Sequence, residues 1–197
     1  MPLWLKLSWS LWLIIWAPAY YRYYGAQNFL WFCDISNLLI GMALWSNSRL
    51  IFSWQAVSVL LVQIVMTVDI LGRLLLGFHP IGGTQYFFKP EIPLFIRLLS
   101  CFHFVIPPLL IWAVRRLGYD RRALKLQMAA MFVVLPLCLL VPKHLDINWV
   151  YGPFDKPQTL VPSWLYFLAC LAGYPLLLYL PSHAILARLF GNPRVPA

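Results

Sequence analysis

The sequence predicts an all-α membrane protein, a polytopic bundle of about six transmembrane helices. Three observations predict this class. Hydrophobic residues occupy 62% of the 197 positions and charged residues only 11%, whereas a soluble domain carries about 25% charged residues. Apolar runs of about 20 residues, the length that crosses a hydrocarbon core, recur along the chain. The ten tryptophans and ten tyrosines cluster near the ends of these runs, as aromatic residues do at membrane interfaces.

Each apolar run is expected to form a helix, because a backbone surrounded by lipid must satisfy its hydrogen bonds within its own segment. We expect one transmembrane domain over residues 1–197, with spans at about residues 3–17, 28–45, 50–78, 94–114, 123–141 and 164–187. The first run loosely resembles a signal peptide, but its tryptophans and its single lysine favour an uncleaved span. Pro107 and Pro108 are expected to kink the fourth span.

The positions of lysine and arginine predict which ends of the spans face the cytoplasm. With the N-terminus inside, nine of these residues fall in inside segments and four in outside segments. The inside group is Lys6, Arg49, Arg115, Arg116, Arg121, Arg122, Lys125, Arg188 and Arg194, and the outside group is Arg22, Lys89, Lys143 and Lys156. We therefore expect both termini in the cytoplasm, with the protein in a plasma membrane or a bacterial inner membrane.

The net charge of +9 comes mainly from the ends of the spans. The basic cluster from Arg115 to Lys125 is interpreted as a topology anchor that touches anionic lipid, since the basic residues do not gather on one soluble face. No nucleic-acid partner is expected, and the oligomeric state stays open. The four cysteines form no CxxC pair and have no spacing to histidine that suits zinc. We therefore expect neither a metal nor another cofactor.

Ionisable side chains inside membrane spans are costly, so they mark a functional site or a paired structural site. In this orientation they fall in the outer halves of the second, third and fourth spans, beneath the two longest loops. With neighbouring polar groups they are Cys33, Asp34, Asn37, Asp69, Arg73, Arg97, Cys101 and His103. Some have a structural interpretation as well, since Asp69 and Arg73 stand at i and i+4 and can pair on one helix face.

A thiol, an imidazole and a carboxylate at one membrane level are the parts of a nucleophilic acyl-transfer site. Cys33 would attack an acyl carbonyl and His103 would take the proton of its thiol. Asp34 would orient His103 or receive a hydrogen bond from it. The sequence alone does not show that the helices carrying these three residues are neighbours.

The substrate of such a site is expected to be a membrane lipid that enters from the side. Arg73 and Arg97 would hold a phosphate at headgroup level, because the planar guanidinium group suits phosphate oxygens. Asp69 and Asn37 lie at the same level and complete the predicted set of lipid-binding residues within the spans.

Three short motifs resemble the YwaF-like integral membrane proteins. The stretch from Leu30 to Leu39, with Cys33 followed by Asp34, is similar to the "L-x-x-C-D/H" signature early in that family. The segment from Phe102 to Pro107 resembles the histidine-bearing helix of the group. The loop residues that resemble its "N-x-x-Y … K-P" pattern are Asn148, Tyr151, Lys156 and Pro157. A related eukaryotic transmembrane acyltransferase family carries a Cys-His version of the first motif.

The resemblance implies acyl transfer between phospholipids, with Cys33 and His103 as the acting residues. The chain departs from the acyltransferase branch at Asp34, where that branch has histidine. The loop of the third motif is interpreted as a lid or headgroup sensor over the polar level, with a proline-stiffened connector as the plainer alternative.

Two other functions fit the same residues as an intramembrane acyltransferase or lipid hydrolase does. A small transporter or ligand-binding protein would use Asp34, Asp69 and Arg73 to bind a solute or a proton, and the prolines of the later spans would permit helix breaks. A structural or assembly subunit would use the same polar groups to bond its helices to one another.

Overall fold

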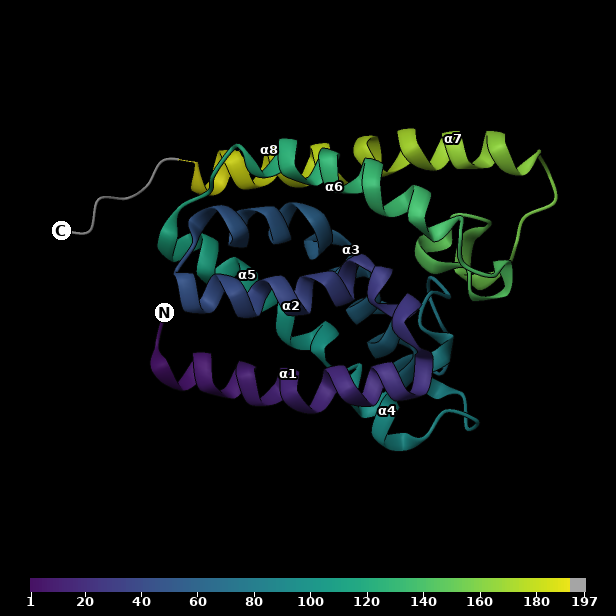
Figure 1. Cartoon of the computed structure of the whole chain (residues 1–197), viewed down its shortest axis with the longest axis horizontal. Coiled ribbons are helices and arrows are strands. Elements are labelled where there is room, and N and C mark those ends of the chain that lie inside the picture. Colours follow the sequence, from purple (N-terminus) through teal and green to yellow (C-terminus); the bar gives the residue numbers. More distant parts are fainter. Residues whose placement is uncertain (192–197) are drawn as a thin grey trace.

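The structure is a computed structural model that describes residues 1–191, apart from the side chain of Asp155. Every regular element in this described range is a helix, which confirms the predicted all-α class. Arg194, one of the residues used to orient the chain, lies outside the described residues. Figure 1 shows the long helices lying side by side as a bundle.

The helices follow the predicted apolar runs, with some changes at their ends. The α-helices are α1 (Leu3–Tyr24), α2 (Phe32–Ser46), α3 (Arg49–Leu76), α4 (Leu94–Leu99), α5 (Phe102–Leu117), α6 (Ala123–Cys138), α7 (Ser163–Gly173) and α8 (Leu180–Phe190). The short 3₁₀ helices are η1 (Ala26–Leu30), η2 (Gln85–Phe88), η3 (Lys143–Leu145), η4 (Ile147–Trp149) and η5 (Pro153–Asp155), and η6 (Tyr174–Tyr179) is a π-helix that joins α7 to α8.

Three helical stretches in the described range are long and apolar enough to cross a membrane: Arg49–Leu76, Leu94–Leu117 and Ser163–Phe190. They are compatible with the predicted membrane protein. The helices α2 and α6 are apolar but shorter, with 15 and 16 residues. The helix α1 has 22 residues but is not among these three stretches.

The long helix α3 lies at the centre of the bundle, where it packs against α2, α5, α6 and α8. The starts of α1, α3 and α6 and the ends of α2, α5 and α8 lie on the left in Figure 1, and we call this the terminal end. Residues 77–93 and 139–162 connect the helices on the right of the figure, at what we call the loop end.

The fourth predicted span is interrupted at Ser100 and Cys101, between α4 and α5. Both prolines lie inside α5, after the interruption. Pro107 has no N–H group, so the carbonyl of His103 lacks its usual partner within the helix. The Thr67 hydroxyl of α3 donates to this carbonyl at 2.9 Å. A neighbouring helix therefore satisfies the backbone group that the proline leaves free.

Aromatic side chains pack the loop end of α1 against the rest of the bundle. Trp16 is fully buried, and its ring meets Phe29 of η1 and Phe102 of α5 edge-on, at centroid distances of 5.5 and 6.1 Å. One turn further along α1, the Tyr20 hydroxyl is 2.6 Å from the Ser100 hydroxyl at the break between α4 and α5. These contacts fix the position of the first turn of α5, which carries His103.

Candidate functional site

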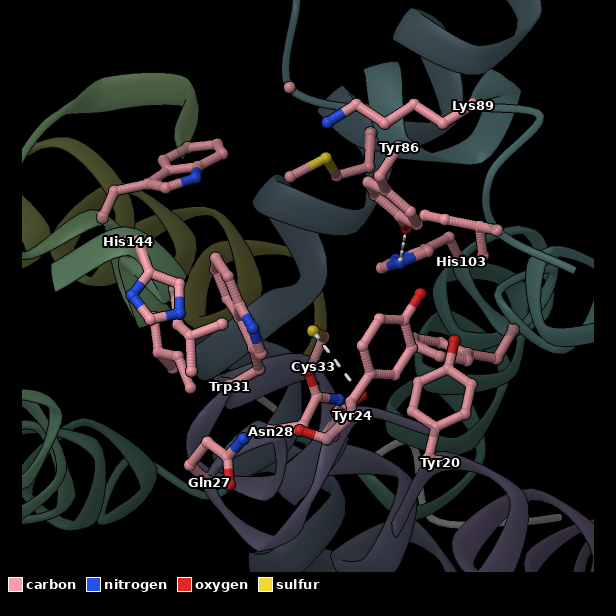
Figure 2. Close-up of a pocket in the computed structure, with 18 residues that line it drawn as sticks. Tyr20, Tyr24, Gln27, Asn28, Trp31, Cys33, Tyr86, Lys89, His103 and His144 are labelled. Carbon is pink, nitrogen blue, oxygen red and sulfur yellow. Dashed lines mark hydrogen bonds between the residues drawn. The ribbon is translucent and has the colours of Figure 1, made fainter. Parts of the chain in front are cut away.

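A cavity of about 410 Å³ lies at the loop end, between the helices and the two connecting segments. Its lining residues are Tyr20, Tyr24, Gln27, Asn28, Trp31, Cys33, Asp34, Met66, Gly83, Tyr86, Lys89, Ile92, Phe102, His103, His144, Leu145, Ile147 and Trp149. Figure 2 shows these side chains converging on one space from helices and from both connecting segments.

The three predicted catalytic residues all line this cavity. Cys33 and Asp34 lie in the first turn of α2. His103 lies in the first turn of α5. The fold therefore brings together two helix starts that are far apart in the sequence. As a result, a thiol, a carboxylate and an imidazole line the same cavity, and Figure 2 shows Cys33 and His103 on it.

Asp34 is buried beside the thiol of Cys33. Its Oδ2 accepts a hydrogen bond from the amide of Asn28 at 2.6 Å, and its Oδ1 is 3.9 Å from the Cys33 sulfur. Cys33 itself is half-buried and faces the cavity. Among the described residues no hydrogen bond joins Asp34 to His103, so Asp34 contacts the thiol and does not orient the imidazole as the sequence suggested.

His103 is oriented by two residues that the sequence did not indicate. Its Nδ1 is 2.5 Å from Oε1 of Gln63, and its Nε2 is 3.0 Å from the Tyr86 hydroxyl. An amide oxygen only accepts hydrogen bonds, so Nδ1 carries the ring proton and Nε2 accepts from Tyr86. Burial raises the pKa of Tyr86 well above its usual value of 10.0, which keeps this hydroxyl protonated as a donor at neutral pH.

Asp69 lies outside the cavity wall and anchors the segment 77–93 instead. Its carboxylate, fully buried, accepts hydrogen bonds from the backbone N–H groups of Ile81, Gly82 and Thr84 at 2.8–2.9 Å. The Thr84 hydroxyl donates to it at 2.6 Å, and His79 Nδ1 is 3.3 Å away. Asp69 thus fixes the loop that brings Tyr86 to His103.

The two arginines predicted to bind phosphate do not reach the cavity. The Arg73 guanidinium donates to the carbonyl of Gly77 rather than pairing with Asp69, because the carboxylate is occupied by loop N–H groups. The Arg97 guanidinium is 3.5 Å from the carbonyl of Phe87. The basic side chains that line the cavity, besides His103, are Lys89 and His144.

Asn37 is buried on α2, one turn below the cavity-lining residues, and its backbone carbonyl accepts a hydrogen bond from Trp9 of α1 at 3.0 Å. Its side chain does not line the cavity. None of the four predicted binding residues within the spans lines the cavity. These residues are Asn37, Asp69, Arg73 and Arg97.

The segment 139–162 contributes to the site mainly through Asn148. The Asn148 side chain donates to the carbonyl of Leu30 at 2.7 Å and accepts from the N–H of Phe32 at 3.2 Å. It therefore caps α2, which has no cap of its own, immediately before Cys33. Tyr151 donates to a carbonyl at the end of α6, Lys156 is exposed, and neither lines the cavity.

Several residues of the cavity wall are not among those that the sequence predicted. Tyr20 and Tyr24 lie beyond the predicted first span at about residues 3–17, but α1 extends to Tyr24, and their i, i+4 spacing places both on the cavity side. Gln63 is an isolated amide within the apolar run of α3, which is a detectable signal. Tyr86 and Lys89 lie in a connecting segment whose fold depends on Asp69, and no local pattern marks them.

No group of three or more His, Cys, Asp or Glu side chains arranged for a metal ion occurs among residues 1–191. No known protein family, curated protein or solved structure matches the chain.

Proposed function

We propose that the protein is an intramembrane lipid-modifying enzyme that transfers or hydrolyses an acyl group at Cys33. The observation that carries the proposal is that Cys33, Asp34 and His103 line one cavity. The resemblance of the motifs around these residues to YwaF-like proteins and to a related acyltransferase family supports the same reading.

The proposal includes a topology of about six spans with both ends in the cytoplasm. Two facts support it. The start of α1 and the end of α8 lie at the same end of the bundle (Figure 1), as an even number of crossings requires. The basic cluster from Arg115 to Lys125 joins α5 to α6 at this terminal end, where positive charges anchor a cytoplasmic face. The cavity then lies in the outer half of the bilayer, near the ester groups of the lipids.

The proposed reaction begins with attack of the Cys33 sulfur on the carbonyl carbon of a lipid ester. Nε2 of His103 is the unprotonated ring nitrogen, and it takes the thiol proton when the Tyr86 hydroxyl turns from Nε2 to the carbonyl oxygen. The ester C–O bond then breaks, the lipid alcohol leaves with the proton from His103, and a thioester on Cys33 remains. A second alcohol or water reverses these steps and releases the acyl group.

The experiment is acyl transfer by the purified chain in lipid nanodiscs, with a diacyl phospholipid as donor and a lysophospholipid as acceptor. Mass spectrometry would follow both the new diacyl product and free fatty acid. We expect Cys33→Ala to abolish turnover, because no other group at that position attacks the carbonyl. The control is Cys170→Ala, a cysteine outside the cavity. Normal turnover by Cys33→Ala would refute the proposal.

A further inference from the structure

A buried serine lies behind the pair formed by Tyr86 and His103. Ser100 stands at the break between α4 and α5, is 1% exposed and does not line the cavity. Its backbone carbonyl accepts a hydrogen bond from the N–H of His103 at 3.2 Å, so the serine is held three residues before the imidazole. Any effect of Ser100 on the site therefore passes through its neighbours.

The Ser100 hydroxyl has two tyrosine neighbours. One is Tyr20 of α1, whose hydroxyl oxygen is 2.6 Å from Ser100 Oγ. The other is Tyr86, since burial raises the pKa of Tyr86 and a hydrogen bond with Ser100 acts in the opposite direction. Figure 2 shows Tyr20 and Tyr86 on the side of the cavity that carries His103. Tyr20, Ser100 and Tyr86 therefore form a row of hydroxyl groups that ends at the imidazole, and we call it the hydroxyl row.

The direction of these hydrogen bonds follows from Gln63 on the other side of the imidazole ring. Its amide oxygen accepts from Nδ1 of His103, so Nε2 is an acceptor and the Tyr86 hydroxyl donates to it at 3.0 Å. Because Tyr86 gives its only hydroxyl proton to Nε2, it can only accept from Ser100, and Ser100 can then only accept from Tyr20. Every hydroxyl of the row thus donates toward His103.

We propose that Ser100 and Tyr20 are positioning residues, which orient the Tyr86 hydroxyl and strengthen its hydrogen bond to His103. Hydrogen bonds that run in one direction polarise one another, so a hydroxyl that accepts a bond donates a stronger one. The far end of the row is held by a helix, because Tyr20 belongs to α1. The donor strength of Tyr86 thus depends on a helix that is distant from it in the sequence.

The consequence for turnover rests on the proposed function. In the proposed reaction the Tyr86 hydroxyl leaves Nε2 of His103 and donates to the carbonyl oxygen of the ester. A hydrogen bond received from Ser100 makes Tyr86 a better donor to the negative charge that develops there. Ser100→Ala is therefore expected to lower turnover by about three- to tenfold, the range of one ordinary hydrogen bond.

The test is ¹⁵N NMR of the purified full chain, labelled at histidine, in detergent. The ¹⁵N resonance of Nε2 in His103, identified by its loss in His103→Gln, reports the strength of the hydrogen bond from Tyr86. We expect Ser100→Ala to move this resonance toward that of a free acceptor, by less than Tyr86→Phe does. Tyr20→Phe should move it in the same direction by a smaller amount. Ser100→Thr keeps the hydroxyl and should restore the wild-type resonance.

Two control variants separate this effect from a general loss of packing. Ser36→Ala removes another buried serine hydroxyl, which has no hydrogen-bond partner among the described residues. Tyr24→Phe changes another tyrosine of the cavity wall. Both are expected to leave the Nε2 resonance of His103 where it is.

Four results would overturn the proposal. They are an unchanged resonance in Ser100→Ala, a displacement in Ser100→Thr as large as in Ser100→Ala, an equal displacement in either control, and a protonated Nε2 in the wild-type chain. If Ser100→Ala does not fold, an unchanged resonance in Tyr20→Phe overturns it instead.

The NMR measurement and the acyl-transfer assay can fail separately. A displaced resonance in Ser100→Ala, together with a wild-type chain that turns over no ester, would remove the proposed enzyme and keep the hydroxyl row. Turnover that needs Cys33, with resonance and turnover both unchanged in Ser100→Ala, would remove the hydroxyl row and keep the enzyme.

Discussion

At the scale of single residues, the imidazole of His103 is the most constrained group in the site. Gln63 and Tyr86 occupy its two ring nitrogens, and Thr67 occupies its backbone carbonyl. This arrangement selects one tautomer, with the proton on Nδ1, and leaves Nε2 as the only basic atom. In the proposed reaction, Tyr86 therefore controls whether His103 accepts the proton of Cys33, since the Tyr86 hydroxyl must first turn away from Nε2.

Tyr86→Phe tests this role. It removes the donor to Nε2, so the ¹⁵N resonance of this nitrogen in histidine-labelled protein should move toward that of a free acceptor, while Nδ1 stays protonated. Among the four histidines, the His103 signals are those missing from His103→Gln. Turnover should fall about 10²-fold, as when a donor to a developing oxyanion is removed. Tyr24→Phe, on the same wall, should change neither; equal effects of both variants would contradict the role.

At the scale of elements, the segment 77–93 is held by one carboxylate rather than by secondary structure. Asp69 gathers three backbone N–H groups and the Thr84 hydroxyl from a stretch that contains one short helix, η2. All four donors point at a fully buried carboxylate, where each hydrogen bond to a charge is worth more than in water. The position of Tyr86 and Lys89 over the cavity depends on this anchor.

Asp69→Asn tests the anchor. The amide presents one acceptor oxygen where the carboxylate has two, so some loop N–H groups lose their partner, at a cost of about 1–3 kcal/mol. Amide hydrogen exchange at residues 81–84 should speed up, and the melting temperature in detergent should fall by several degrees. Glu91→Gln removes an exposed carboxylate of the same segment and should do neither. Unchanged exchange in Asp69→Asn would show that the segment is held by other contacts.

At the scale of the whole molecule, the two ends of the bundle differ in chemistry. The terminal end carries the run of basic residues between α5 and α6, with Arg122 and Arg49 beside the buried Asp120. Hydrogen bonds from Arg122 hold the pKa of Asp120 below its usual range, so this carboxylate stays charged at neutral pH. The loop end carries the cavity. This asymmetry is what a chain oriented by the positive-inside rule is expected to show.

Cysteine labelling tests the orientation. Thr159→Cys places a thiol on an exposed loop-end position, and Ser46→Cys places one at the exposed end of α2, at the terminal end. A membrane-impermeant maleimide should label the first in intact cells and the second only after permeabilisation, with the wild-type cysteines as background. The reverse pattern would contradict the inside N-terminus. Labelling of both positions from one side would contradict the three crossings that are predicted between residues 46 and 159.

Much of this organisation was predictable from apolar runs, because a long run in lipid has few alternatives to a helix. The shared level of Cys33, Asp34 and His103 also followed from span order and polarity. The hydrogen-bond partners of the polar side chains were not predictable from the sequence. Asp69 and Arg73 have helical spacing for a pair, yet loop N–H groups compete successfully for the carboxylate. The partners of His103 come from other segments, and such tertiary contacts leave no periodic trace in one sequence.

The contact between Asn148 and the start of α2 couples the position of the segment 139–162 to the order of the turn that carries Cys33. A displacement of the segment 139–162 that withdraws Asn148 would free the N–H of Phe32 and the carbonyl of Leu30. The first turn of α2, with its cysteine, then frays. In the proposed enzyme, the position of the nucleophile therefore depends on a residue that lies more than 100 positions further along the chain.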